Sequence, residues 1–288
     1  MPTTYAHYKF GKDVIDALPR GLKESIVKNR QLFDIGVHGP DILFYIFSPF
    51  KGDVRDTGTG LHKQPSRIFF EHSKEVIKKA PDPVAARVYM YGFITHFVLD
   101  SECHKYVEKM IQASGVDHNE IETEFDAYLL KGERRNPILV NRTRHLQPSF
   151  KNANVIAPFF NGVRIKTMAI KKNGSKAITP MDIKRTLMAQ ILLHKILSAK
   201  TPRKRKLLNV LTELRSDGES IRGLIVNKSP NPKCEDYNEI LKKIYSAAIP
   251  LAISLIMQYQ KYLFQNEPLS ERFDLAYDEG EDWEKIVL

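Results

Sequence analysis

The sequence predicts an all-α fold, a single bundle of several helices. Apolar residues recur at helical spacing along most of the 288 residues. Four segments also carry helix start signals, in which a capping residue precedes a proline or an acidic first turn, at Asp82, Asp117, Thr179 and Thr201. Strand-like runs are short and fall within residues 136–150 and 154–172, so they do not predict a sheet.

The first half of the chain carries most of the predicted helices. Helical periodicity begins at residue 11, and the helix after Asp82 contains a long apolar run. One glycine-rich polar segment, residues 48–66, predicts a loop that is long enough to be functional. The helices predicted in this half are 11–18, 21–33, 40–47, 66–79, 83–113 and 117–130.

The second half contains three predicted helices, 180–199, 202–215 and 235–265. The first two begin at the Thr-Pro pairs of residues 179–180 and 201–202. The third contains the most apolar window, residues 244–257, which is shorter than the roughly 20 residues that cross a membrane. We therefore predict a buried helix there and no transmembrane segment.

Composition indicates one globular domain. Hydrophobic residues make up 42% of the chain, which is enough for a full core. A soft boundary near residues 131–150 separates a metal-binding catalytic core, residues 1–130, from a basic helical half, residues 131–288, that completes the same domain and ends in an acidic tail. Two cysteines form no disulfide framework, and no secretory signal pattern opens the chain. We expect a cytoplasmic protein.

Charge is unevenly distributed along the chain. The net charge is −2 over residues 1–130, +18 over residues 131–266 and −6 over residues 267–288. A block of +18 attracts phosphates, an anionic membrane surface or nucleic acid, although such blocks are also often only a solvated face. The charge alone leaves these alternatives open.

Histidine is concentrated where the acids are interleaved with it. Seven of the nine histidines lie in the first 118 residues. In the stretch "HFVLDSECH", His96, Asp100 and His104 recur every four residues, which places them along one face of an apolar helix. His118 and Glu122 repeat this spacing on the next helix. Because imidazole and carboxylate are zinc ligands and idle polar groups are penalised in a core, the pattern predicts a metal site.

Three further residues are candidates for the same site. Asp41 follows a Gly-Pro turn that holds its carboxylate at a helix start, His62 ends the glycine-rich segment, and His7 lies near the start of the chain. Each could also be an ordinary packed or first-turn residue. His72 competes with His62 as a ligand, but its amphipathic helix favours a structural role. Cys103 is interpreted as a small buried core residue and not as a thiolate ligand.

These motifs together resemble the zinc-dependent phospholipase C family, which is all-helical and related to single-strand-specific zinc nucleases. The resemblance rests on "TYAHYKFG", "GPDILFY", "GTGLH", "YGFITHFVLDSECH" and "DHNEIETEFD". They span roughly residues 4–126, in the family's order and spacing.

The resemblance implies a cluster of two to three zinc ions in a cleft. It implies that Asp41 also orients or deprotonates the attacking water. The implied ligand sets are Asp41, His62, His96 and Asp100 for one ion, His104, His118 and Glu122 for a second, and His7 with a bridging Asp100 for a third.

The function implied is hydrolysis of a phosphodiester by metal-activated water. The products from a phospholipid are diacylglycerol and a phosphorylated headgroup. A second hypothesis is a zinc-dependent nuclease or nucleotidase, since nucleic acid carries a similar diester and suits the basic block. A third is a metal-stabilised helical domain that binds lipid or protein without catalysis.

Overall fold

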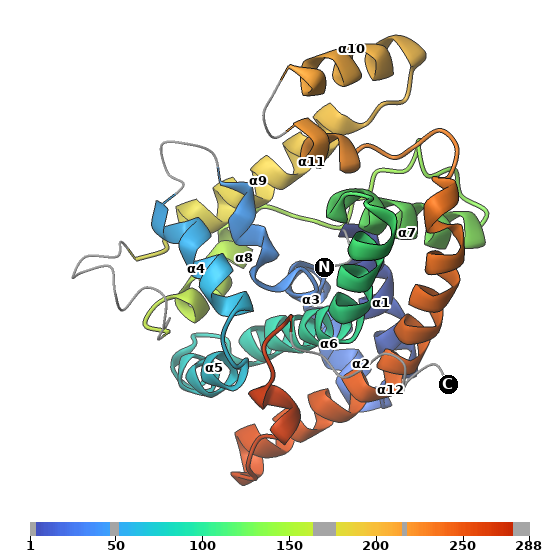
Figure 1. The fold of residues 1–288 in the computed structure, drawn as a ribbon. Coiled ribbons are helices and arrows are strands. Elements are labelled where there is room, and N and C mark those ends of the chain that lie inside the picture. The colour runs from blue at the N-terminus through green and yellow to red at the C-terminus, as the bar shows by residue number, and fades with distance from the viewer. Residues whose placement is uncertain (1–3, 47–51, 164–176, 215–217, 279–288) are drawn as a thin grey trace.

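The structure is a computed structural model that describes residues 4–46, 52–163, 177–214 and 218–278. Over these residues it is helical and contains no β-strand, so the all-α prediction is confirmed (Figure 1). The elements in chain order are α1 (Thr4–Ala17), α2 (Arg20–Lys28), α3 (Arg30–Gly36), the 3-10 helix η1 (Gly39–Tyr45), α4 (Gly52–His62), α5 (Arg67–Lys79), α6 (Pro83–Ser114), α7 (His118–Gly132), α8 (Phe150–Phe160), α9 (Pro180–Leu197), α10 (Pro202–Glu213), α11 (Gly218–Gly223), the 3-10 helix η2 (Pro232–Cys234), α12 (Glu235–Gln265) and the 3-10 helix η3 (Glu271–Asp274).

Local capping explains why the longer helices begin where the sequence predicts. The Asp82 carboxylate accepts from the Ala85 backbone N–H at 2.9 Å at the start of α6, and Asp117 accepts from Asn119 N–H at 2.9 Å beside α7. At α9, the N-cap residue Thr179 and Asp182, the third residue of the helix, form a reciprocal capping box. Each cap satisfies backbone donors that the first helical turn leaves without an intrahelical partner.

The first helix begins earlier than predicted, at Thr4 instead of residue 11. The Asp126 carboxylate of α7 accepts from Tyr5 N–H at 3.1 Å and from Ala6 N–H at 2.7 Å. This cap comes from a residue far along the chain, so no local signal marks the helix start. As a result, His7 lies on α1 itself.

The predicted loop at residues 48–66 is wrong for residues 52–62, which form α4, whereas residues 63–66 connect α4 to α5 without helix. Gly58 lies where a Cβ atom would be 3.2 Å from Leu43 Cβ and 3.3 Å from the Pro40 carbonyl oxygen. The glycine therefore allows α4 to pack closely on η1. Glycine serves packing here, and not the conformational freedom of a loop.

Two more helices were not predicted. Residues 150–160 of the supposed strand-like region form α8, which Ser149 caps by accepting from Asn152 N–H at 3.1 Å. Part of the second strand-like run, residues 164–172, lies outside the described residues. The short α11 was also missed, and the predicted helix 21–33 is two helices that meet at Asn29.

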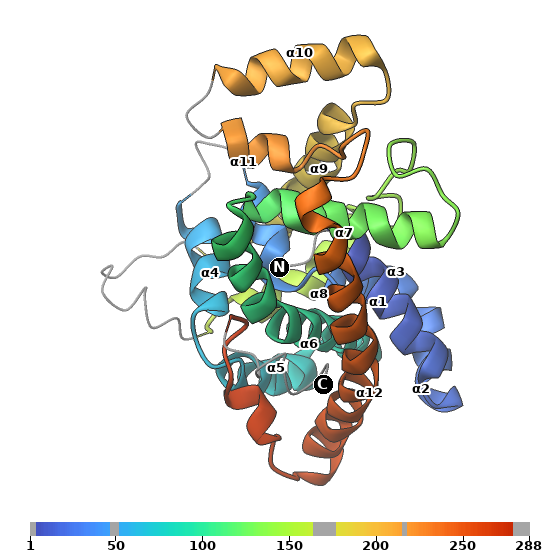
Figure 2. The same cartoon turned by 45° about the vertical axis from the view of Figure 1, so that its right-hand side comes forward.

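Helix α6 is the centre of the fold. Figures 1 and 2 show α1, α5 and α12 arranged around it. Helix α3 crosses it so closely that a Cβ on Gly36 would lie 2.3 Å from the Tyr89 carbonyl oxygen, and one on Gly92 would lie 2.4 Å from that of Phe33. The crossing fixes α6 against the α3–η1 connection one turn before His96.

Buried residues of both halves of the chain join one main core, which includes Phe33, Phe97, Leu187 and Tyr245. A second, smaller cluster consists of Leu197, Ala199, Leu208 and Ile225 and lies under α10. Figure 2 shows α10 at the outer edge of the molecule. The boundary near residue 130 stays a prediction.

Helix α12 carries the most apolar window. The stretch Pro232–Gln265 is long and apolar enough to cross a membrane by length and composition, the one such helix found among the described residues. It packs along α6 and α1 and buries the rings of Tyr245 and Tyr259. Only 39% of its apolar window is buried, so one face of the helix packs on the core and the predicted burial holds for that face alone. The predicted lack of a transmembrane segment stays a prediction.

Candidate metal centre

Three elements bring four predicted ligands together. Asp41 comes from the first turn of η1, His62 from the end of α4, and His96 and Asp100 from successive turns of α6. Each offers a ligand atom, and these atoms all lie within 4.8 Å of one another. We call these four residues the metal group.

The closest approaches within the metal group are between unlike atoms. His62 Nε2 lies 3.0 Å from Asp41 Oδ1 and 3.8 Å from Asp100 Oδ2. His96 Nε2 lies 3.2 Å from Asp100 Oδ2 and 4.0 Å from Asp41 Oδ1. Two imidazole nitrogens and two carboxylates thus surround one small space.

These atoms are near one another but do not form hydrogen bonds with good geometry. His62 Nε2, both nitrogens of His96, Asp41 Oδ1 and both oxygens of Asp100 are buried without a hydrogen-bond partner among the described residues. Leaving one such group unpaired costs about 1–3 kcal/mol, and more for a charged one. A cation bound between them would satisfy His62 Nε2, His96 Nε2, Asp41 Oδ1 and Asp100 Oδ2, and imidazole with carboxylate is a donor set that fits zinc.

The orientation of His62 also suits a metal ligand. Its Nδ1 lies 2.8 Å from the Gly58 carbonyl oxygen, one turn earlier on α4. In the neutral ring this contact assigns the proton to Nδ1 and leaves the lone pair on Nε2, the atom that faces Asp41. Such a hydrogen bond behind the ring is typical of metal-binding histidines.

His7 extends the group on its buried side. Its Nε2 lies 3.1 Å from Asp100 Oδ1, and its ring centroid is 4.4 Å from that of His96. Both of its nitrogens are buried and lack a hydrogen-bond partner among the described residues. Asp100 therefore faces His96 through one oxygen and His7 through the other.

The pKa values of the metal group are set by burial and by contacts among neighbouring imidazoles and carboxylates. Burial alone would raise the pKa of Asp100, but His96 and His7 outweigh it and hold that pKa well below its ordinary range. Burial lowers the pKa of His96. For His62, burial acts to lower the pKa, but the nearby Asp41 and Asp100 carboxylates outweigh it and the net shift is upward. The core thus keeps an ionised Asp100, which favours a bound cation.

The group opens towards solvent on one side only. The side chains of Asp41 and His62 are 15% and 13% exposed, whereas those of His96 and Asp100 are fully buried. A water or a substrate oxygen therefore reaches the group past Asp41 and His62.

A family model for zinc-dependent phospholipase C matches residues 6–172, more than half of the chain. The chain belongs to the zinc-dependent phospholipase C family. The resemblance predicted from residues 4–126 is thereby confirmed. Comparisons with curated proteins and with solved structures each gave no match.

In this phospholipase C-family chain, the second predicted ligand set is less closely assembled. His118 Nε2 lies 2.8 Å from Glu122 Oε1, and the His104 ring centroid is 6.1 Å from that of His118. Glu122 is buried, while the His118 side chain is 32% exposed. The three residues share one region between α6 and α7, and their role as ligands stays a prediction.

His72 and Cys103 lie as the sequence analysis favoured. His72 packs near α8, where its Cε1 would lie 3.6 Å from a Cβ atom on Gly162, and it is not part of the metal group. Cys103 is fully buried, and burial raises the pKa of its thiol. The structure thus places His62, and not His72, beside Asp41.

Sequence reasoning missed two residues around the group, Tyr277 and His145. Tyr277 lies 5.1 Å from His62 and 5.7 Å from His96 between ring centroids, and its backbone N–H donates to the His62 carbonyl at 3.3 Å. His38, whose ring centroid is 6.5 Å from that of His7, pairs with His145 at 2.7 Å between their Nε2 atoms. Tyr277 and His145 come from the second half of the chain, and no spacing pattern connects them to the motifs of the first half.

Proposed function

We propose that this chain is a zinc-dependent phosphodiester hydrolase of the phospholipase C type, which cleaves a phospholipid to diacylglycerol and a phosphorylated headgroup. Membership of the family supports the general activity. The observation that carries the proposal is the set of buried imidazole and carboxylate atoms that converge without hydrogen-bond partners among the described residues.

We further propose two to three zinc ions. The metal group supplies four donors for one ion, and the placement of His7 against the second oxygen of Asp100 supports a neighbouring ion that Asp100 bridges. The proximity of His104 to His118 and of His118 to Glu122 supports another. The proposed ligands are His7, Asp41, His62, His96, Asp100, His104, His118 and Glu122.

Bound zinc supplies a Lewis acid that lowers the pKa of a water molecule towards neutrality and offsets the charge of the phosphoryl oxygens. The chain's own residues then orient the reactants. Asp41 is the most exposed carboxylate of the group, so it is placed to accept a proton or a hydrogen bond from the attacking water. His96 and Asp100, fully buried, hold the inner side of the group rigid and exclude water there.

A phospholipid substrate requires contact with a membrane, and α10 offers a suitable face. Its inner side buries Leu208 and Thr212, while its outer side carries basic Arg203 and Lys206, both exposed. An exposed apolar stripe at helical spacing beside basic residues is typical of helices that lie in the interface of an anionic membrane. The exposed fractions along this stripe are 57% for Leu207, 46% for Val210, 50% for Leu211 and 79% for Leu214.

A comparison of two histidine variants tests the site. His62→Gln should lose the zinc ion of the metal group and the hydrolysis of a chromogenic phosphodiester, whereas the matched control His72→Gln should keep both. Zinc is measured by elemental analysis of the purified protein, and hydrolysis with and without a chelator. A wild-type zinc content in His62→Gln, or its loss in His72→Gln alone, contradicts the assignment.

Substrate assays separate the alternatives. We expect release of diacylglycerol from short-chain phosphatidylcholine and little cleavage of single-stranded DNA. Preferential cleavage of DNA would support the nuclease hypothesis, and zinc binding without either activity would support a non-catalytic domain. We propose a cytoplasmic location, which the two free, buried cysteines support.

A further inference from the structure

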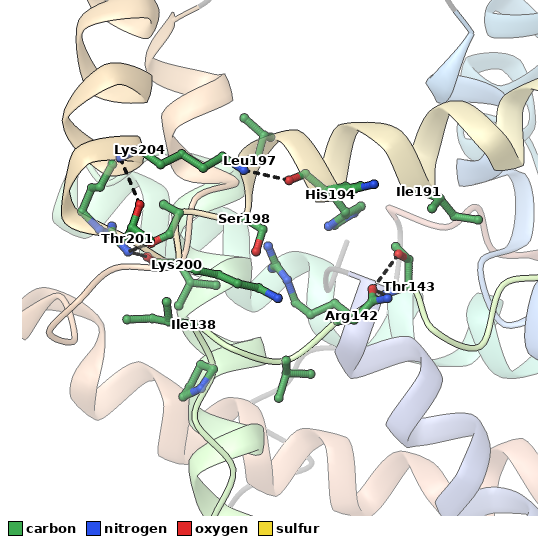
Figure 3. A pocket seen from close by; sticks show the side chains of 17 residues that line it. Ile138, Arg142, Thr143, Ile191, His194, Leu197, Ser198, Lys200, Thr201 and Lys204 are labelled. Atoms are coloured by element: carbon green, nitrogen blue, oxygen red, sulfur yellow. Dashed lines mark hydrogen bonds between the residues drawn. The ribbon is translucent and has the colours of Figure 1, made fainter.

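A second site lies away from the metal group, in a cavity of about 520 Å³. Its walls are the segment 137–143, the C-terminal half of α9 and the first turn of α10 (Figure 3). No proposed zinc ligand lines it. A cavity of this size fits a small molecule, since ligand pockets commonly measure about 300–1,000 Å³.

The charged side chains that line the cavity are all basic. No aspartate or glutamate is among its lining residues. Burial lowers the pKa of His194, also on the wall, to about 3, so this histidine is neutral at pH 7 and adds no charge. The basic residues are Arg142, Lys195, Lys200, Lys204 and Arg205.

Three of these cations are held in place by the protein. Lys204 donates to the Lys195 carbonyl at 3.0 Å, and Arg205 donates to that of Val226 at 2.9 Å. Arg142 is buried, donates to the Leu224 carbonyl at 3.0 Å and lies 3.4 Å from the Asp126 carboxylate. Within the part of the chain that the structure describes, Arg142 is the one of these three with a carboxylate partner, and that partner, Asp126, does not line the cavity.

Lys195 and Lys200 have no carboxylate partner among the described residues. Figure 3 shows the Lys200 side chain extended towards the guanidinium of Arg142 inside the cavity. Both lysines are exposed, so water screens part of their repulsion with Arg142, and an anion bound between Lys200 and Arg142 would offset the remainder. The cavity is thus complementary to an anion with more than one charge.

The remaining wall is apolar. Ile138, Val140, Ile191, Leu197 and Val226 line the same cavity. A ligand that fits both parts carries a multiply charged acid group and a less polar body. Guanidinium and ammonium groups bind phosphate through charge-assisted hydrogen bonds.

We propose that this cavity binds a phosphate monoester, either a soluble phosphorylated compound or the headgroup of a phosphatidate-like lipid. The site adjoins the elements that carry the metal group, because His194 Nε2 lies 3.0 Å from Thr4 Oγ1 of α1 and its ring centroid is 6.3 Å from that of Tyr45 of η1. This binding activity goes beyond the proposed hydrolysis, since a monoester contains no diester bond to cleave.

Calorimetric titration of the full, zinc-loaded chain tests the proposal. The probes are inorganic phosphate, glycerol 3-phosphate and dioctanoyl phosphatidate, at physiological salt so that weak surface attraction is screened. The test variant is Lys195→Gln with Lys200→Gln. The control is Arg222→Gln with Lys243→Gln, which removes the same charge from exposed residues of α11 and α12 that do not line the cavity.

We expect the test variant to bind glycerol 3-phosphate at least about tenfold more weakly than the wild type, because two charge-assisted contacts are lost. The control should stay within about twofold. Tighter binding of dioctanoyl phosphatidate than of glycerol 3-phosphate would identify the lipid as the source, and equal binding the soluble ester.

Two results would overturn the proposal: equal affinity in all three proteins, which includes the case that none binds the probes, or an equal loss in both variants, which indicates general charge attraction. Diester hydrolysis is measured in parallel in the same variants. A chain that binds the monoester but hydrolyses no diester refutes only the proposed function, so the two failures are distinguishable.

Discussion

Replacing Gly39 by alanine should displace His96 from the metal group. Gly39 begins η1 with φ of +48°, and a Cβ built there would lie 2.0 Å from His96 Cδ2 and 2.7 Å from His96 Nε2. Carbon atoms in contact lie about 3.5–4.0 Å apart. The imidazole ring must therefore move away from Asp41 and Asp100 to admit the methyl group.

The size of the effect follows from two contributions. A left-handed backbone costs an alanine about 1–2 kcal/mol, and overpacking a core costs about 1–3 kcal/mol. We expect Gly39→Ala to lower the free energy of unfolding by about 2–5 kcal/mol. Because the shifted atom is a proposed ligand, zinc affinity should fall at least about 10- to 100-fold, the range seen when residues that support a ligand are changed.

Gly115→Ala is the matched control. Gly115 ends α6 with φ of +68°, and a Cβ there would meet nothing within 4 Å. It should lose only the backbone contribution of about 1–2 kcal/mol and keep its zinc. Urea unfolding gives the stabilities, and competition with a chromogenic chelator gives the affinities. Equal zinc affinity in the two variants would refute the inference that Gly39 positions His96.

Three further predictions concern the reaction, the membrane face and pH. Asp41→Asn should keep most of its zinc but hydrolyse a chromogenic diester about 10²- to 10⁴-fold more slowly; a wild-type rate would exclude its role. Replacing both Leu211 and Leu214 by serine should weaken binding to anionic vesicles, measured by co-sedimentation, about tenfold or more. Leu139→Ser, at another exposed leucine, should leave this binding unchanged. Equal binding by the two variants would show that α10 does not contact the membrane. Burial lowers the pKa of His145 to about 3, so between pH 6.5 and 3 the unfolded chain binds a proton that the folded chain does not. The stability contributed by this residue is therefore lost as pH falls through that range, by about 1.4 kcal/mol per pH unit. In His145→Gln, the free energy of unfolding measured in urea should decline less steeply with falling pH. An unchanged dependence on pH would contradict a neutral His145 ring in the folded chain.

Elements with local signals were predictable from the sequence. The caps at Asp82 and Asp117 and the Thr-Pro pairs lie next to the helices they start, so a short window of sequence contains the cause. The pair His96 and Asp100 was predictable for the same reason, because four-residue spacing on one helix fixes their relation.

The rest of the site depends on contacts between distant residues. Asp126 caps the start of α1, and Gly58 allows α4 to pack against η1. The helices that carry His7 and His62 therefore cannot be predicted from the residues next to them in the sequence. Tyr277 reaches His62 only after the chain returns from α12. The hydrophobic pattern of the sequence could not predict the positions of these residues, because tertiary packing places them and local helix propensity does not.

The small cluster beneath α10 attaches this helix to the rest of the molecule through few buried side chains. Within α10, Leu208 and Thr212 are the buried residues, and transferring one leucine to water costs only about 1.5–3 kcal/mol. Its amides should therefore exchange with deuterium through local opening, long before those of α6, whose exchange requires opening of the main core. Helix α10, the proposed membrane contact, can thus unfold locally and refold while His96 and Asp100 on α6 keep their positions.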